Sequence, residues 1–184
     1  MGSFQDALRC LPPSKLFVNK KSGTVTSYRM SDACPDVSNT EKSKPALVFL
    51  HGFNGSSKSW CQQISYFNEN VVIAIDAPGF GESHVVGNSM VAIANETAGL
   101  VRDLDLGPVV IIGHSMGGMQ AQIIASKFPD SIYTSKPAHL VLNKSPNCLY
   151  NFFIVASSPT LMPYGGFIIT VPDECLGLKS LISS

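Results

Sequence analysis

Three short apolar runs, each followed by a stretch with helical spacing, constrain the fold of this chain most. The runs are "ALVFL" (46–50), "VVIAI" (71–75) and "VVIIG" (109–113). None alternates apolar with polar residues, which is typical of strands buried on both faces of a sheet. Apolar residues at helical spacing follow them in residues 57–67, 90–104 and 116–127. This alternation predicts an α/β protein with a mostly parallel sheet and helices on both faces.

The residues around this repeating part add further elements. Residues 15–29 alternate on either side of a turn at Lys20–Gly23, which predicts an N-terminal hairpin. Residues 31–45 are polar and carry Pro and Ser, so they are expected to form a loop. The run "HLVLN" (139–143) predicts a fourth buried strand.

The pattern changes after Asn143. No charged residue occurs from Ser145 to Pro172, but prolines and glycines divide this apolar stretch into short runs. Those runs are too short to cross a bilayer, so no membrane span is expected.

The charge and the cysteine content indicate which classes of partner and metal site the sequence does not favour. Thirteen basic and thirteen acidic residues give a formal net charge of zero, so the sequence has no electrostatic signature of nucleic-acid binding. The five cysteines are widely spaced, with no CxxC or metal-ligand spacing, which predicts reduced thiols and no metal site. The first ten residues contain no apolar signal segment, so a cytoplasmic location is expected. Nothing in the sequence sets an oligomeric state.

One motif carries recognisable chemistry. "GHSMGG" (113–118) fits G-x-S-x-G between a predicted buried strand and a predicted helix. A serine in so sharp a turn adopts a strained backbone, and small residues two positions before and after it let neighbouring chains pass closely. Its hydroxyl stands above the sheet edge at a helix N-terminus, where free N–H groups favour developing negative charge.

Two further stretches follow strands in the same way. "HGFNGS" (51–56) comes after the strand at 46–50, and "DAPGFGES" (76–83) after the strand at 71–75. With "GHSMGG" in this order, the chain resembles the α/β-hydrolase superfamily over about residues 15–143, specifically its serine esterase, lipase and peroxidase-like branch. The resemblance implies an α/β-hydrolase fold that is incomplete at its C-terminal strands. It implies residues 1–144 as a partial core, and 145–184 as a divergent tail or the start of a cap segment.

The resemblance also implies roles for individual residues. Ser115 is the expected nucleophile, and the backbone N–H groups of Phe53 and Met116 are the expected oxyanion hole. The implied substrate is a small ester, thioester or related acyl compound, with no cofactor. Because the nucleophile position holds Ser and not Asp, the resemblance argues against the epoxide-hydrolase and dehalogenase branches.

A base for Ser115 is not recognisable in the sequence. The one histidine after Ser115, His139, begins a predicted strand and so belongs at the opposite sheet edge, on the order of 15 Å away. His114 should point away from Ser115, and in the family the position of His51 is structural. His84 follows the Gly-rich loop at the correct edge, but the family gives its position no catalytic role.

The triad acid is equally unrecognised. Asp173 and Glu174 follow the strand-like run "GFIITV", but they also fit a solvated pair in an irregular tail. Asp76 follows its strand directly, but in the family this position shapes the loop. Three interpretations therefore stay open: a serine hydrolase, a hydrolase-like protein that binds a ligand or partner without catalysis, or an inactive fragment lacking the triad acid and histidine.

Overall fold

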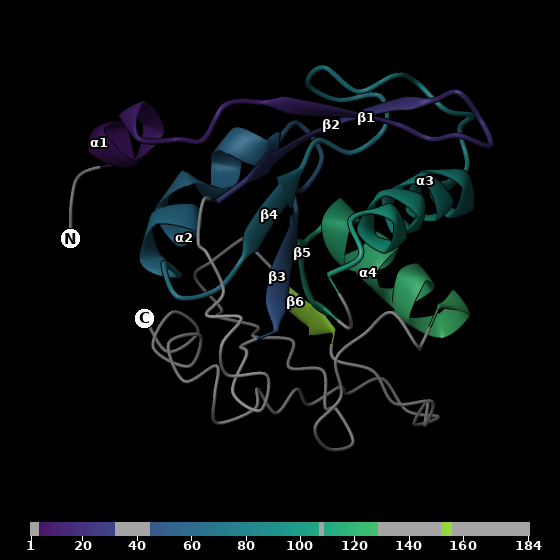
Figure 1. The fold of residues 1–184 in the computed structure, drawn as a ribbon. Coiled ribbons are helices and arrows are strands. Elements are labelled where there is room, and N and C mark those ends of the chain that lie inside the picture. The colour runs from purple at the N-terminus through teal and green to yellow at the C-terminus, as the bar shows by residue number, and fades with distance from the viewer. Residues whose placement is uncertain (1–3, 32–44, 107–108, 129–151, 156–184) are drawn as a thin grey trace.

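The computed structural model of the chain describes residues 4–31, 45–106, 109–128 and 152–155 (Figure 1). The elements in chain order are α1 (Phe4–Arg9), β1 (Lys15–Val18), β2 (Val25–Met30), β3 (Ala46–Leu50), the 3-10 helix η1 (Ser57–Trp60), α2 (Cys61–Tyr66), β4 (Val72–Ile75), α3 (Met90–Asp103), β5 (Val109–His114), α4 (Met116–Lys127) and β6 (Phe152–Val155).

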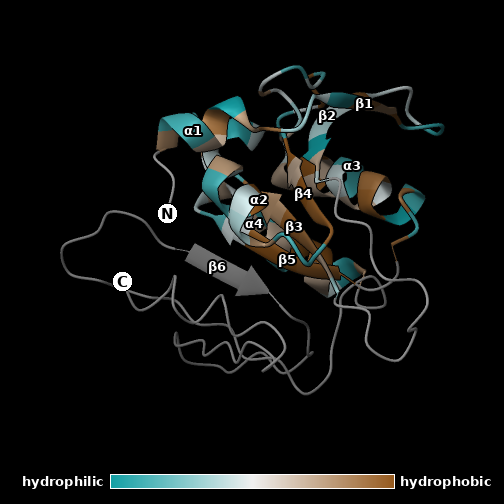
Figure 2. Cartoon of the chain, turned by 60° about the vertical axis from the view of Figure 1, so that its left-hand side comes forward, coloured by the Kyte–Doolittle hydropathy of each residue, from teal (hydrophilic) through white to brown (hydrophobic). Residues whose placement is uncertain are grey.

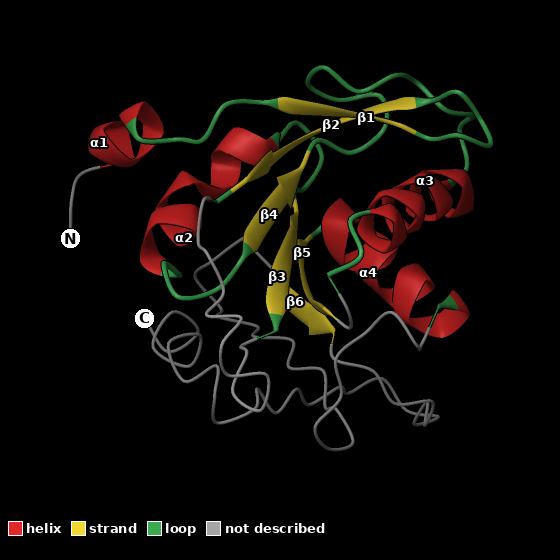
Figure 3. Ribbon diagram, viewed as in Figure 1, coloured by secondary structure: helices red, strands yellow, loops and turns green. Residues whose placement is uncertain are grey.

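The strands form one mixed sheet in the order β1-β2-β4-β3-β5-β6 (Figure 3). Its three central strands are parallel, with Leu50 opposite Ile75 of β4 and Gly113 of β5. β2 runs antiparallel to β4, and β6 runs antiparallel to β5. The carboxyl ends of β3, β4 and β5 therefore meet at one edge, which is where open α/β sheets place their ligands.

Helices cover both faces of this sheet. In Figure 1, α3 and α4 lie on one side of the strands, and η1 and α2 lie on the other. β3, β4 and β5, which lie between these helices, are mostly hydrophobic (Figure 2), and every residue of β3 and β4 is buried.

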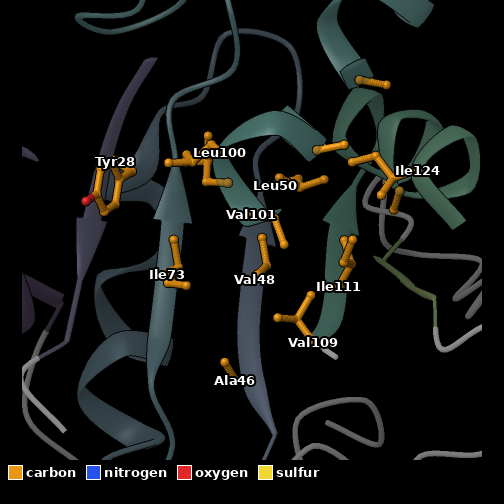
Figure 4. Packing of buried hydrophobic residues seen from close by; sticks show 14 of the residues in the cluster. Tyr28, Ala46, Val48, Leu50, Ile73, Leu100, Val101, Val109, Ile111 and Ile124 are labelled. Carbon is orange, nitrogen blue, oxygen red and sulfur yellow. The ribbon is translucent and has the colours of Figure 1, made fainter. Parts of the chain in front are cut away.

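Each face has its own hydrophobic core. Figure 4 shows the larger one, in which Val48, Ile73 and Ile111 of the sheet pack against Leu100 of α3 and Ile124 of α4. On the opposite face, Leu47, Phe49 and Ile112 pack against Trp60 and Ile64. Alternate residues of one strand thus supply both cores, because successive strand side chains point to opposite faces.

The structure confirms the predicted class and most predicted elements. The hairpin, the three buried strands and the helices from Met90 and Met116 all form, and the Ser89 side chain caps α3 by accepting a hydrogen bond from the Ala92 N–H. The stretch predicted as one helix over 57–67 divides into η1 and α2. Short 3-10 turns are common at the start of an α-helix.

Two described elements were not predicted. α1 has only six residues and buries none of them, so it leaves no apolar period in the sequence. β6 is a four-residue run inside the uncharged stretch, where periodicity does not distinguish a strand from a helix. The predicted loop over 31–45 lies almost entirely outside the described residues, and the predicted strand over 139–143 lies wholly outside them.

The described residues also bear on the thiols and on membrane crossing. Cys10 is exposed and Cys61 buried, and neither forms a disulfide. In this part of the chain, no helix has both the length and the apolar character to cross a membrane.

Candidate active site

Ser115 occupies the turn that joins β5 to α4. Its backbone has φ of 52° and ψ of −113°, an uncommon conformation for a residue other than glycine. The residue is exposed, and its carbonyl accepts hydrogen bonds from the N–H groups of Gly118 (2.9 Å) and Met119 (3.2 Å). The strained turn predicted from G-x-S-x-G is therefore present.

Two glycines make this turn possible through close backbone packing. A Cβ on Gly117 would overlap the carbonyl group of Leu50 and lie 2.8 Å from the carbonyl oxygen of His51. A Cβ on Gly113 would overlap the Gly117 carbonyl. The ends of β3 and β5 and the start of α4 are thus in direct backbone contact, and any larger residue would separate them.

The loop after β3 fixes the direction of one N–H group. The Gly52 carbonyl accepts hydrogen bonds from the Gly55 N–H (3.0 Å) and from Nδ1 of His51 (2.7 Å). The next peptide N–H, that of Phe53, belongs to the same trans peptide plane and points the opposite way. It has no hydrogen-bond acceptor among the described residues. Asn54 completes the turn with φ of 65°.

The N–H of Met116 is the second hydrogen-bond donor considered at the edge where the carboxyl ends of β3, β4 and β5 meet. Met116 is the first residue of α4, and the first N–H groups of a helix have no partner within it. Ser115 caps the helix without a side-chain hydrogen bond, so its hydroxyl does not satisfy these groups. The contacts of Gly52, Gly113 and Gly117 thus hold the loop that contains Phe53 against the start of α4 at Met116.

His51 joins the loop after β3 to the loop after β4. Its Nε2 accepts a hydrogen bond from the Ala77 N–H (3.0 Å), and its Nδ1 lies against the Gly52 carbonyl. A carbonyl can only accept and an N–H can only donate, so the proton of this neutral ring is on Nδ1. Burial lowers the pKa of His51, against the opposing effects of the Gly52 bond and the Asp76 charge. Both ring nitrogens of His51 are thus hydrogen-bonded to backbone groups of the two loops.

Asp76 is the second link between these loops. Its Oδ1 accepts from the Ser57 N–H (2.5 Å) and its Oδ2 from the Ser27 hydroxyl (3.0 Å). The Ser83 hydroxyl donates to the Asp76 carbonyl (2.7 Å) and accepts from the Ser27 N–H (2.8 Å). A buried carboxylate that accepts several hydrogen bonds holds its partners firmly. Asp76 therefore orients the loops, in agreement with the expectation that it shapes the loop after its strand.

The structure places the His114 ring beside Gly52 and the His84 backbone beside β2. The His114 ring packs on Gly52, where a Cβ would lie 2.6 Å from its Nδ1, and burial lowers its pKa. The exposed His84 joins β2 through its backbone N–H, which donates to the Val25 carbonyl (2.8 Å). His139, Asp173 and Glu174 lie outside the described residues.

Ser27 and Ser83 are site-supporting residues that the sequence did not reveal. Ser27 lies 49 positions from Asp76, in a hairpin whose alternating pattern only predicted a strand. No local signal pairs a strand serine with so distant a carboxylate. The motif "DAPGFGES" could have pointed to Ser83, because this serine falls seven residues after Asp76 in the same loop.

This arrangement of the sheet, the Ser115 turn and the two loops matches a known family. The sequence model described as "alpha/beta hydrolase fold" matches residues 45–137, half of the chain. The chain belongs to the α/β-hydrolase family. The match includes all three motif-bearing loops, at 51–56, 76–83 and 113–118.

Individual relatives are hydrolases of several kinds. The chain is 33% identical over 139 residues to epoxide hydrolase 4 of Mus musculus, with 71% of this chain and 38% of the relative covered. It is 36% identical over 92 residues to the sn-1-specific diacylglycerol lipase ABHD11 of Mus musculus, with 48% and 30% covered. A solved thermophilic esterase from Thermogutta terrifontis superposes with a TM-score of 0.53 at 28% identity, covering 65% of this chain and 43% of the esterase. The chain thus spans less than half the length of the relatives it matches.

Proposed function

We propose that this chain carries the nucleophile and oxyanion hole of a serine hydrolase acting on an ester, thioester or related acyl compound. The observation that carries the proposal is the strained Ser115 turn, at a sheet edge where the Phe53 N–H points away from its own loop. Ser115 is exposed, and within the described part of the chain the N–H groups of Phe53 and Met116 have no acceptor, which leaves them able to donate to an anion. This combination is the one that acyl transfer requires.

The chemistry would proceed in two steps. In the first, Ser115 Oγ bonds to the acyl carbon, the bond from that carbon to the leaving group breaks, and the serine proton passes to the departing oxygen or sulfur. In the second, water attacks the acyl carbon, which releases the acid and restores the serine hydroxyl. The carbonyl oxygen bears negative charge in both tetrahedral intermediates, and N–H groups in place before the reaction stabilise it. Loss of one such donor typically reduces the rate by about a hundred- to a thousand-fold.

The relatives include epoxide hydrolases as well as lipases and esterases, and the nucleophile discriminates between these reactions. A serine that opened an epoxide would form an ether, which water does not cleave under ordinary conditions. A serine that attacks an ester forms another ester, which water can cleave. Turnover through Ser115 therefore favours an acyl substrate.

Labelling of Ser115 tests the proposal. A fluorophosphonate probe should modify the chain on the peptide that contains Ser115, and Ser115→Ala should abolish the modification. Ser65→Ala is a matched control, because Ser65 is an exposed serine on α2 whose hydroxyl donates to the Cys61 carbonyl. Equal labelling of the wild type and of Ser115→Ala would overturn the proposal.

A second candidate function is ligand binding without turnover. Turnover needs a base with a ring nitrogen that can accept the serine proton. Both ring nitrogens of His51 are hydrogen-bonded to the loops, and the His114 ring packs on Gly52, which favours this candidate. Steady hydrolysis of a p-nitrophenyl ester by the chain, lost in Ser115→Ala, would exclude this candidate. A single burst of p-nitrophenol without further release would support it.

A further inference from the structure

The loops at the site carry an aromatic pair whose outer ring is uncovered. Phe80 packs edge-on against His51, with ring centroids 5.3 Å apart, and against Phe53, with centroids 5.7 Å apart. Phe80 is partly buried, whereas Phe53 is 71% exposed. One ring is thus fixed between the two loops, and it supports a second ring that is open to solvent.

The open ring lies close to the point where an acyl oxygen would bind. Phe53 supplies both the ring and the N–H that points away from the Gly52 carbonyl. A carbonyl oxygen held at that N–H therefore lies within one side chain's length of the ring. The acyl chain and the leaving group are both attached to that carbonyl carbon, but only the acyl chain remains on it through both steps. The acyl chain is therefore the part of the substrate that can cover the ring throughout the reaction.

Charge around the pair restricts what the covering group can be. Residues 51–55, 77–81 and 113–119 contain no Lys, Arg, Asp or Glu. The adjoining Asp76 is buried and accepts two hydrogen bonds, and Glu82 accepts one from Ser14. A charged acyl group would lose water here without gaining an opposite charge from these loops. An uncharged alkyl chain gains contact with the ring without the cost of removing water from a charge.

We infer that Phe53, supported by Phe80, is a specificity-determining residue that selects substrates with an uncharged alkyl chain of several carbons on the acyl side. The inference rests on the proposed function, because it assigns a substrate class to the same site. Each fully buried methylene contributes roughly a fourfold gain in affinity. An open ring covers only one side of the alkyl chain. We therefore expect an eight-carbon alkyl chain to bind about tenfold more tightly than a two-carbon one.

The test compares two fluorophosphonate probes, one with an ethyl and one with an octyl chain. The octyl probe should label Ser115 about tenfold faster than the ethyl probe. Phe53→Ala, which keeps the backbone N–H, should reduce this ratio to near one. Phe4→Ala removes another exposed phenylalanine, on α1, and should leave the ratio unchanged. Phe80→Leu should lower the ratio in part, because it removes the support of the Phe53 ring.

Equal rates for the two probes in the wild type would overturn the inference and leave the proposed function standing. Faster octyl labelling in Phe53→Ala than in the wild type would also overturn it, because it would mean that the ring obstructs the alkyl chain instead of binding it. If neither probe labels Ser115, the proposed function fails. The subsite is then tested by ligand-observed NMR with Ser115→Ala. Stronger binding of 2-decanone than of 2-butanone, lost on adding Phe53→Ala, supports the subsite, and equal binding overturns it.

Discussion

The two halves of the candidate site are held in place by different forces. The turn at Ser115 is maintained by the absence of side chains, because Gly113 and Gly117 let backbone carbonyls approach where a Cβ would overlap them. The loops after β3 and β4 are maintained by buried polar groups, chiefly His51 and Asp76, which bond to backbone N–H and carbonyl groups. The Ser115 turn thus depends on the small volume of its glycines, and the loops depend on buried hydrogen bonds.

This difference predicts how each half fails. An added methyl group should damage the serine turn at any pH, because overlap does not depend on protonation. The loops should tolerate small changes of volume but not the loss of a buried acceptor, because an unsatisfied buried donor costs about 1–3 kcal/mol. Three substitutions and a change of pH distinguish damage by overlap from damage by the loss of a hydrogen bond.

The largest effect is expected from Gly117→Ala. In an ordinary helix this change stabilises by about 1 kcal/mol. Here the new Cβ would overlap the Leu50 carbonyl, and we expect a net loss of about 3 kcal/mol or more in the free energy of unfolding. Urea denaturation measures the loss. Gly87→Ala is the matched control, since a Cβ there meets no atom within 4 Å. Equal stability of the two variants would contradict the packing argument.

Asp76→Asn should have the next largest effect. The amide keeps the shape of the side chain, but it replaces one acceptor oxygen by a donor, which faces the Ser57 N–H or the Ser27 hydroxyl. We expect a loss of about 2 kcal/mol in the free energy of unfolding. Glu82→Gln is the control, because its carboxylate is exposed and, among the described residues, accepts one hydrogen bond, from Ser14. A loss no greater than that of the control would show that the carboxylate does not hold the loops.

Ser27→Ala should cost about 1 kcal/mol, since it removes one neutral donor to Asp76 and leaves the Ser57 N–H bond intact. In combination with Asp76→Asn its cost should shrink, because the two residues share one interaction. Fully additive losses in the double variant would argue against a shared network.

The pH dependence is the smallest effect, because at neutral pH the His51 ring is already in its bonded, uncharged form. Burial lowers the pKa of His51 and of His114 in the folded state, whereas in the unfolded chain both have the ordinary value near 6.5. Their contribution to stability is complete above pH 6.5 and declines as the pH falls below it, because the unfolded state binds more protons there. The groups near His51 are Asp76, which favours protonation, and His114, which opposes it.

Urea denaturation at a series of pH values between about 7.5 and about 5 measures this decline. His51→Gln should make the decline shallower and leave the part due to His114. An identical slope in the variant would contradict the role of the neutral imidazole.

Several features of this fold and site follow from local sequence alone. The helix over 116–127 forms with the predicted bounds, and β5 ends one residue beyond the predicted strand. The strands are predictable because each is an unbroken apolar run, and burial on both faces requires such a run. The site loops are predictable because their glycines and polar residues directly follow these strands.

Other features depend on contacts that no local pattern encodes. The bond from Ser27 to Asp76 joins residues 49 positions apart. The proton position on His51 follows from two backbone groups in different loops. The direction of the Phe53 N–H follows from a carbonyl that receives two bonds at once. Each needs the three-dimensional arrangement of the β3 and β4 ends before it can be deduced.

We propose that Ser115 and the N–H groups of Phe53 and Met116 act on one acyl group. A crystal structure of the chain after reaction with a fluorophosphonate tests it most directly. We expect phosphorus bonded to Ser115 Oγ, with the phosphoryl oxygen within hydrogen-bond distance of the N–H groups of both Phe53 and Met116. Phosphorus on another residue, or a phosphoryl oxygen directed away from both N–H groups, would contradict it.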